Sequence, residues 1–166
     1  MPRTGPPAAD PTEIFPFPIG RTPPDDRAYF EMITWFVFGA GLNWRVLRAK
    51  WPNFEKAFKK FNHNAVSKFT DDDIDRLLAD AGIVRHGKKI TSAIENAREI
   101  RAIAKEHGGM TSWIRSYRGD SETLIKDTKK RFHHLGDTTA RLFLTCAGAL
   151  EYQTWKPTDR QKAGTA

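Results

Sequence analysis

The spacing of hydrophobic residues along the chain predicts a series of helices. A first helix is expected over 27–38, where apolar side chains recur at intervals of three and four residues: Phe30, Ile33 and Val37. Asp25 and Asp26, which come before it, suit the positive end of a helix dipole. No stretch of useful length alternates apolar and polar residues, which is the pattern of a half-buried strand. We therefore expect an all-α fold.

Helix start and stop signals divide the rest of the chain. A short helix is expected over 44–50, and Pro52 then suits the first position of a new helix. Thr70 and Asp73 form a variant of the capping box, so the next helix begins there and stops by Gly82. The remaining helices are expected over 86–107, 111–117 and 121–130, with a last one that opens at Thr138.

Composition indicates one domain and an anionic partner. A chain of 166 residues with 39% hydrophobic content can bury one sizeable core. The 27 Lys and Arg residues against 20 Asp and Glu give a formal charge of +7, which favours nucleic acid or a membrane surface. No apolar run approaches the roughly 20 residues of a membrane span. With one cysteine, Cys146, a disulfide framework is excluded, and we expect a soluble cytoplasmic protein.

The distribution of prolines separates the two ends from the middle of the chain. Residues 1–24 hold eight of the ten prolines and are expected to form an extended arm. The helical domain is expected over 25–155, and a C-terminal tail over 156–166.

The stretch WFVFGAGLNW, residues 35–44, combines aromatic residues with a run of small ones. Gly39, Ala40 and Gly41 can end a helix and leave a thin backbone from which Leu42 and Trp44 project. An alternative interpretation is a buried helix end packed with aromatic side chains, because apolar stripes at helical spacing are usually core.

A second stretch, KKRFHHLGD, places a turn directly before a helix. Lys129, Lys130 and Arg131 precede His134 and Gly136 in the turn, and Thr138 opens the helix. Unpaired backbone N–H groups at such a helix start can bind a phosphate oxygen, and the cations can neutralise neighbouring phosphates. The alternative is an ordinary connection between two helices.

The order and spacing of these motifs resemble the 3-methyladenine DNA glycosylase I family of the helix-hairpin-helix superfamily. DDRAYFE (25–31) is similar to the family's DDRxLFE, and GAGLNW (39–44) to its QAGLSW. TKKRFHHLG (128–136) is similar to the family's LKKRGFKFVG segment and is one residue shorter. Three further segments follow the family in register: FEKAFKKFN (54–62), DDDIDRLLADAGIVRHGKKI (71–90) and IENAR (94–98).

The resemblance implies a bilobal helical bundle that kinks double-stranded DNA, flips out a damaged nucleotide and hydrolyses its N-glycosidic bond. Gly41 and Leu42 would fill the gap left by the flipped nucleotide. Phe36, Asn43 and Trp44 would contact the base, with Trp44 as the stacking wall. The hairpin would bind DNA phosphates through six residues: Lys129, Lys130, Arg131, His134, Gly136 and Thr138.

Several positions depart from the family pattern. Phe36 stands where the family has a glutamate that contacts the base, and Gly39 replaces its glutamine. Asp137, at the start of the phosphate-binding helix, is unfavourable toward a phosphate. The polar residues of the family's YHDxEWG motif are replaced by apolar ones: Ile14, Phe15 and Ile19.

The family's zinc ligands also have no counterpart here. Its N-terminal histidine aligns with Phe15, its C-terminal histidine aligns with Gln153, and its cysteine ligands are missing. We expect no structural zinc and no other cofactor, with Phe15 and Phe17 packing the arm onto the domain instead.

No residue stands out as the catalytic group. Cys146 lies mid-helix among apolar residues and is interpreted as a small core residue. Glu31 is interpreted as structural. Glu151 is the one carboxylate to test, because superfamily relatives place a catalytic aspartate beyond the hairpin.

The leading hypothesis is a monomeric DNA glycosylase for alkylated purines, with a more apolar pocket than the family's. Two alternatives stay open. One is a non-catalytic DNA-binding protein that retains the fold but not the chemistry, and the other is a protein-interaction module that uses the same groove.

Overall fold

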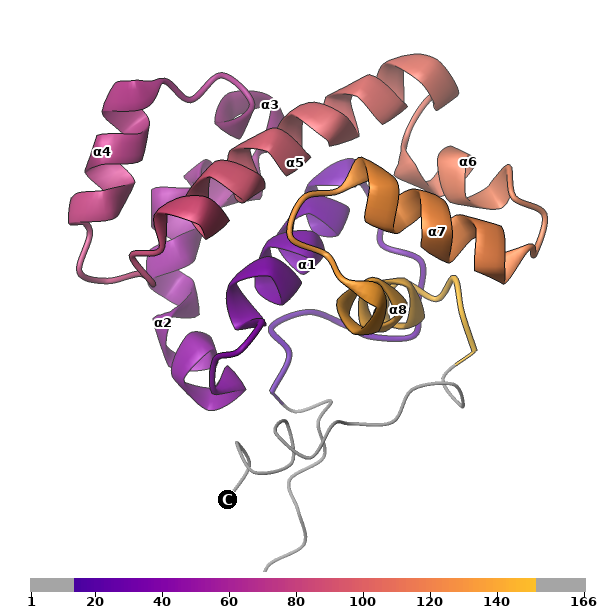
Figure 1. Cartoon of the computed structure of the whole chain (residues 1–166), viewed down its shortest axis with the longest axis horizontal. Coiled ribbons are helices and arrows are strands. Elements are labelled where there is room, and N and C mark those ends of the chain that lie inside the picture. The colour runs from indigo at the N-terminus through magenta and orange to yellow at the C-terminus, as the bar shows by residue number, and fades with distance from the viewer. Residues whose placement is uncertain (1–13, 152–166) are drawn as a thin grey trace, which may run out of the picture.

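Helices account for all the regular secondary structure within residues 14–151, the part of the chain that the computed structural model describes (Figure 1). The expected all-α fold is confirmed for these residues. The elements are α1 (Asp26–Gly39), α2 (Trp44–Ala57), the 3₁₀ turn η2 (Lys59–Phe61), α3 (His63–Val66), α4 (Asp71–Ala79), α5 (Gly87–His107), α6 (Met110–Arg115), α7 (Ser121–Arg131) and α8 (Asp137–Cys146).

The helices begin and end at capping residues that the sequence predicts. Asp25 caps α1, because its carboxylate accepts a hydrogen bond from the Ala28 N–H at 2.8 Å. Thr70 and Asp73 form the expected capping box at the start of α4. Gly108, with φ +87°, ends α5 in the left-handed conformation that glycine adopts without strain.

Pro52 lies inside α2, so the prediction of two helices that meet there is wrong. An interior proline removes one backbone hydrogen bond and usually kinks or breaks a helix. Here the neighbouring aromatic residues keep the two halves in line: Trp51 and Phe54 are both buried and stack with ring centroids 5.2 Å apart. The proline ring is on the exposed side of the helix.

Helices α1 and α5 form the centre of the molecule and divide it into two lobes. Both helices pack against each other, and α5 also contacts α3, α4 and α6. Figure 1 shows α2, α3 and α4 on one side of this pair and α6, α7 and α8 on the other. From Met32 to Gly39 every residue of α1 is buried. This central position fixes where the C-terminal end of α1 emerges.

The second half of the expected arm packs on this core. Phe15 is buried, and its ring lies 5.8 Å from Phe36 and 6.0 Å from Trp35, centroid to centroid. The Gly20 N–H donates a hydrogen bond to the Cys146 carbonyl at the end of α8, at 2.8 Å. The expectation that Phe15 attaches the arm is therefore confirmed. Residues 1–13, 152–155 and the expected tail lie outside the described range.

Within residues 14–151 no helix is both long enough and apolar enough to cross a bilayer.

We predict that Gly148→Ala loosens the arm. Gly148 has φ +73°, and a Cβ atom there would lie 3.0 Å from the carbonyl carbon of Arg21. The left-handed conformation alone costs alanine about 1–2 kcal/mol, and the close approach adds roughly 1–3 kcal/mol of overpacking. Gly119→Ala is the matched control, because φ is +82° and no atom lies within 4 Å of its Cβ position. Urea denaturation compares the two, and equal losses of stability would contradict the prediction.

Candidate nucleic-acid interface

The turn between α1 and α2, residues 40–43, is the first part of the interface and is called the wedge turn below. Gly41 adopts φ +75°, which lets the chain reverse directly after α1. The Leu42 N–H donates to the Gly39 carbonyl at 3.1 Å, and the Asn43 side chain caps α2 by accepting from the Arg45 N–H at 2.9 Å. Gly41 and Asn43 are exposed and Leu42 is partly buried. The turn therefore presents Leu42 on a short, braced loop.

A buried lysine holds the wedge turn in place. The Lys89 ammonium donates to the carbonyls of Phe38 and Ala40, at 3.1 and 2.7 Å. These carbonyls lie at the negative end of the α1 dipole, where a cation is favourable. Burial lowers the pKa of Lys89 from its ordinary value. Sequence analysis missed this residue, because the contact spans about 50 positions of the chain and no local pattern announces it.

Trp44 turns its indole back toward the end of α1. Its Nε1–H donates to the Gly39 carbonyl at 3.3 Å. A Cβ atom on Gly39 would lie 3.0 Å from that nitrogen, so this orientation depends on a residue without a side chain. The lack of a side chain at Gly39 therefore leaves room for the Trp44 ring.

Aromatic side chains close around Trp44. Phe15 from the arm lies 5.2 Å from the Trp44 ring and Phe36 from α1 lies 6.3 Å from it, centroid to centroid. Trp44 keeps 9% of its surface exposed and Phe36 keeps 1%. The structure thus brings together two of the three predicted base contacts, Phe36 and Trp44, and adds Phe15, which the sequence marked only as an anchor for the arm.

The turn between α7 and α8, residues 132–136, is the second part of the interface and is called the hairpin turn. Buried Asn96 of α5 holds it through two hydrogen bonds: its Oδ1 accepts from the His133 N–H at 2.7 Å, and its Nδ2 donates to the His133 carbonyl at 3.1 Å. His134 adopts φ +63°. The Gly136 N–H already donates to the Thr139 hydroxyl at 3.1 Å, so a phosphate would have to compete with that hydroxyl.

Most of the hairpin's basic side chains are paired with carboxylates of the same molecule. Lys129 contacts Asp137 at 3.3 Å, and His133 contacts Glu95 of α5 at 3.0 Å. Arg131 turns back to α5, where it pairs with Glu99 and Glu106. Lys130, Gly136 and Thr138 are exposed and His134 is half-buried. The predicted phosphate contact of Arg131 therefore competes with two ion pairs.

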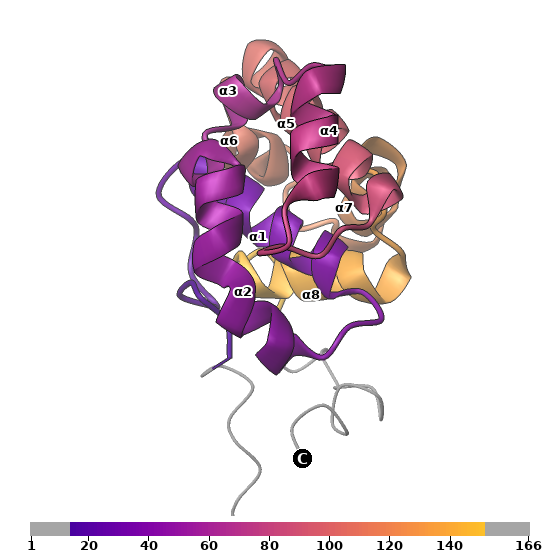
Figure 2. The same cartoon turned by 90° about the vertical axis from the view of Figure 1, so that its left-hand side faces the viewer.

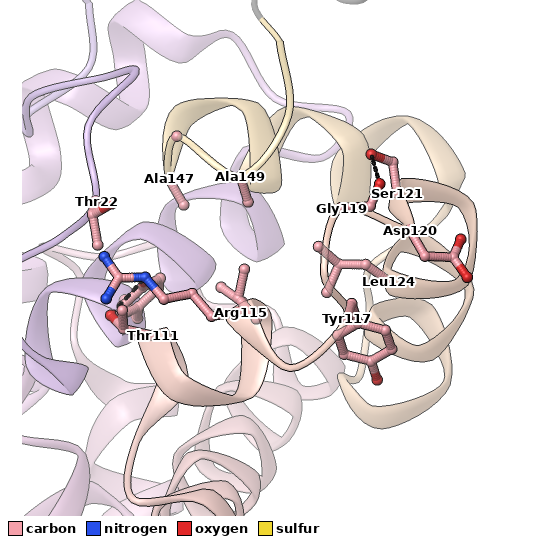
Figure 3. Close-up of a pocket in the computed structure, with 13 residues that line it drawn as sticks. Thr22, Thr111, Arg115, Tyr117, Gly119, Asp120, Ser121, Leu124, Ala147 and Ala149 are labelled. Atoms are coloured by element: carbon pink, nitrogen blue, oxygen red, sulfur yellow. Dashed lines mark hydrogen bonds between the residues drawn. The ribbon is translucent and has the colours of Figure 1, made fainter.

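A hollow of about 210 Å³ lies elsewhere in the molecule, between α6, the start of α7 and the end of α8 (Figure 3). Its polar side chains include Arg115, Thr111 and Tyr117. The Tyr117 hydroxyl donates to Asp127 at 2.6 Å, and burial together with this carboxylate raises the pKa of Tyr117 to about 12. The Tyr117 hydroxyl therefore stays protonated at neutral pH. None of the wedge-turn residues lines this hollow.

The contacts of Cys146 and Glu31, two residues considered for catalysis, indicate structural roles. Cys146 is buried, which confirms its interpretation as a core residue, although it is the last residue of α8 and not in the middle of a helix. Burial raises the pKa of its thiol to about 12. Glu31 accepts a hydrogen bond from Trp51 Nε1 at 3.2 Å and pairs with Arg27 at 3.6 Å. Glu151 is exposed and is the last described residue, so its catalytic role stays a prediction.

The side chains that could bind a metal ion are dispersed over the described residues. Within residues 14–151, no three His, Cys, Asp or Glu side chains are grouped closely enough to hold a metal ion. Gln153 lies outside this range, and the expected lack of zinc stays a prediction.

We predict that Asn96→Ala unfolds the hairpin turn more readily than it unfolds the rest of the protein. The substitution leaves the His133 N–H and carbonyl without their protein partners, at a cost of about 1–3 kcal/mol. Asn64→Ala is the control, because Asn64 is exposed. Amide hydrogen exchange at 132–136 and urea denaturation measure the effect. Unchanged protection of these amides would show that Asn96 does not hold the turn.

Comparison with known proteins shows which family this chain resembles. The family model for methyladenine glycosylases matches residues 19–154. The chain is 28% identical to DNA-3-methyladenine glycosylase 1 of Escherichia coli (strain K12), with 75% of this chain and 77% of the relative covered. It is 26% identical to DNA-3-methyladenine glycosylase of Haemophilus influenzae, with 76% and 80% covered.

Solved structures show the same arrangement. A crystal structure of 3-methyladenine DNA glycosylase I superimposes with a TM-score of 0.74 at 27% identity, covering 87% of this chain and 91% of that one. The Staphylococcus aureus enzyme, studied for 3-methyladenine recognition, gives 0.74 at 25% identity and covers 92% and 93%. A variant of 3-methyladenine DNA glycosylase I in complex with 3-methyladenine gives 0.75 at 25% identity and covers 92% and 94%.

Proposed function

The chain belongs to the methyladenine glycosylase family, and from this membership we propose that it hydrolyses the N-glycosidic bond of an alkylated purine in double-stranded DNA. The observation that carries the proposal is the placement of Leu42 and Trp44 at either end of one three-residue segment beside the buried rings of Phe15 and Phe36. These two rings and Trp44 form the proposed base pocket. An apolar wedge and a stacking wall are the two elements that a base-flipping enzyme needs close together.

The pocket favours a cationic, planar base. Alkylation at a ring nitrogen makes adenine cationic, and a positive ring over the face of a tryptophan gains about 2 kcal/mol when it is desolvated. Phe36 offers no hydrogen bond at the position where the family has a glutamate. Selection in this chain therefore rests on shape and on attraction between the cation and the aromatic rings, and the substrate is of the 3-methyladenine type.

The positive charge of the base also supports the reaction. An alkylated purine leaves with its bonding electrons as a neutral molecule, so bond cleavage needs less acid catalysis than in most hydrolases. Water adds to the anomeric carbon of an oxocarbenium-like sugar, as in glycoside hydrolysis. The DNA phosphates stabilise the charge on the sugar, and the protein contributes by flipping, stacking and excluding water.

The proposal extends to the setting of the reaction. The protein acts on duplex DNA as a monomer in the cytoplasm, without zinc or another cofactor. Leu42 and Gly41 fill the gap in the duplex, and the exposed Lys130 and Thr138 contact phosphates at the hairpin turn.

A second function has one observation in its favour. Phe15 covers the Trp44 ring, and Phe36 has no polar group, so the pocket is apolar and closed. A non-catalytic DNA-binding protein would retain the wedge turn and the hairpin turn in this form. Release of free base separates it from an enzyme.

We predict that purified protein releases methylated purines from alkylated duplex DNA and that Trp44→Ala lowers this activity. Loss of about 2 kcal/mol of stacking corresponds to a roughly 10-fold to 30-fold decrease in kcat/KM. Trp44→Phe keeps an aromatic face, so its kcat/KM should lie between that of the wild type and that of Trp44→Ala. Chromatography of released base measures the rate, and circular dichroism checks that each variant is folded. If the wild-type protein releases no methylated purine from the DNA, the enzyme function is contradicted and the non-catalytic function is supported.

We also predict that Leu42→Ala slows base release from a fully paired duplex. The smaller side chain cannot replace the lost stacking, so flipping becomes less favourable. The defect should shrink when the damaged base is opposite a mismatch, because such a base costs less to flip. Ile114→Ala is the control, since it truncates a partly buried apolar side chain of α6. An equal defect on paired and mismatched substrates would remove Leu42 from this role.

A further inference from the structure

We propose that the beginning of α5 is a second binding surface for the DNA phosphate backbone, formed by Arg85, His86 and Lys88 between the wedge turn and the hairpin turn. The inference rests on the proposed function, because it assumes that duplex DNA is the ligand. It adds residues outside the hairpin to the sequence-independent part of the binding.

The position of this surface follows from contacts at both of its edges. On one side, Lys89 donates to the carbonyls of Phe38 and Ala40 and so ties the start of α5 to the wedge turn. On the other side, the rings of His86 and His134 meet edge to face, with centroids 6.2 Å apart, and join it to the hairpin turn. Figure 2 shows the two turns and the start of α5 together on its right-hand side. A duplex that contacts both turns passes over the residues between them.

The charge of this surface is not compensated by neighbouring acids. Arg85, His86 and Lys88 are all exposed. None of the ion pairs formed within residues 14–151 includes any of the three. The pKa of His134 is lowered by burial first, and then by the neighbouring charges of Lys89 and Lys88. The start of α5 is therefore a region of positive potential, which attracts a polyanion.

Of the three Lys and Arg residues that precede the hairpin turn, in contrast, two are held in ion pairs within residues 14–151, and the exposed Lys130 is not. Lys129, Arg131 and His133 are all paired with carboxylates of Asp137, Glu99, Glu106 and Glu95. Binding a phosphate with these side chains would first require breaking an ion pair within the protein. Arg85 and Lys88 have no such competitor, so each phosphate they neutralise releases counterions from the DNA at no cost in internal pairing.

The double variant Arg85→Gln/Lys88→Gln tests this surface. Binding to an undamaged fluorescent duplex is measured by anisotropy between about 50 and 200 mM salt. Two phosphate contacts contribute about 1.8 to the slope of log K against log salt, so the slope should fall by that amount and the affinity roughly tenfold or more. Lys68→Gln/Lys105→Gln is the matched control, because it removes the same charge from exposed positions between α3 and α4 and in the last turn of α5.

The outcomes separate this inference from the proposed function. A reduced slope in the α5 variant and an unchanged slope in the control support the second surface. Equal slopes for the α5 variant and the wild type, with base release intact, overturn it and leave the glycosylase function in place. If the slope falls in the α5 variant but the wild-type protein releases no base from methylated DNA, the second binding surface is supported and the glycosylase function is contradicted. Equal reductions in both double variants overturn it as well, since net charge alone would explain them.

Discussion

The hydrogen bonds from the buried Lys89 ammonium to the end of α1 are the interaction on which the interface depends. A charged group that loses its water needs close polar partners, and the two carbonyls at the negative end of α1 provide them. Asn96, which holds the hairpin turn, lies seven residues further along α5, which is two turns and about 10 Å along the helix axis. One face of one helix therefore fixes the spacing between the wedge turn and the hairpin turn.

The aromatic cluster around Trp44 depends on three residues that fit one another: Gly39, Phe36 and Phe15. Gly39 leaves room for the indole of Trp44, Phe36 supplies an apolar ring, and Phe15 packs against both rings. A buried carboxylate at position 36 would need a hydrogen-bond donor, and its ring neighbours Phe15, Phe17 and Trp44 offer none toward it: the one indole N–H among them is already bonded to Gly39. The apolar side chains of the arm and the apolar side chain at position 36 thus suit one another.

The features that sequence could predict are those set by neighbouring residues. Asp25, the box formed by Thr70 and Asp73, and Gly108 all act within one helical turn, and the structure confirms each of them. Pro52 was mispredicted because aromatic packing around α2 outweighs a local helix-breaking signal. Asn96 and His133 are 37 residues apart, and the ion pairs of Arg131 bridge α7 and α5. Such contacts depend on the folded arrangement, so no local pattern could assign Arg131 to a carboxylate rather than to a phosphate.

The position of Phe15 makes the arm an internal ligand of the pocket. Phe15 is joined to the domain by the same chain whose backbone is anchored at Gly20, so it is always present at a high effective concentration near Trp44. A base that stacks on the same face binds only the fraction of molecules in which Phe15 has withdrawn, and its apparent affinity is reduced by that fraction. The anchoring of the arm at Gly20 thereby affects how readily the pocket accepts a base.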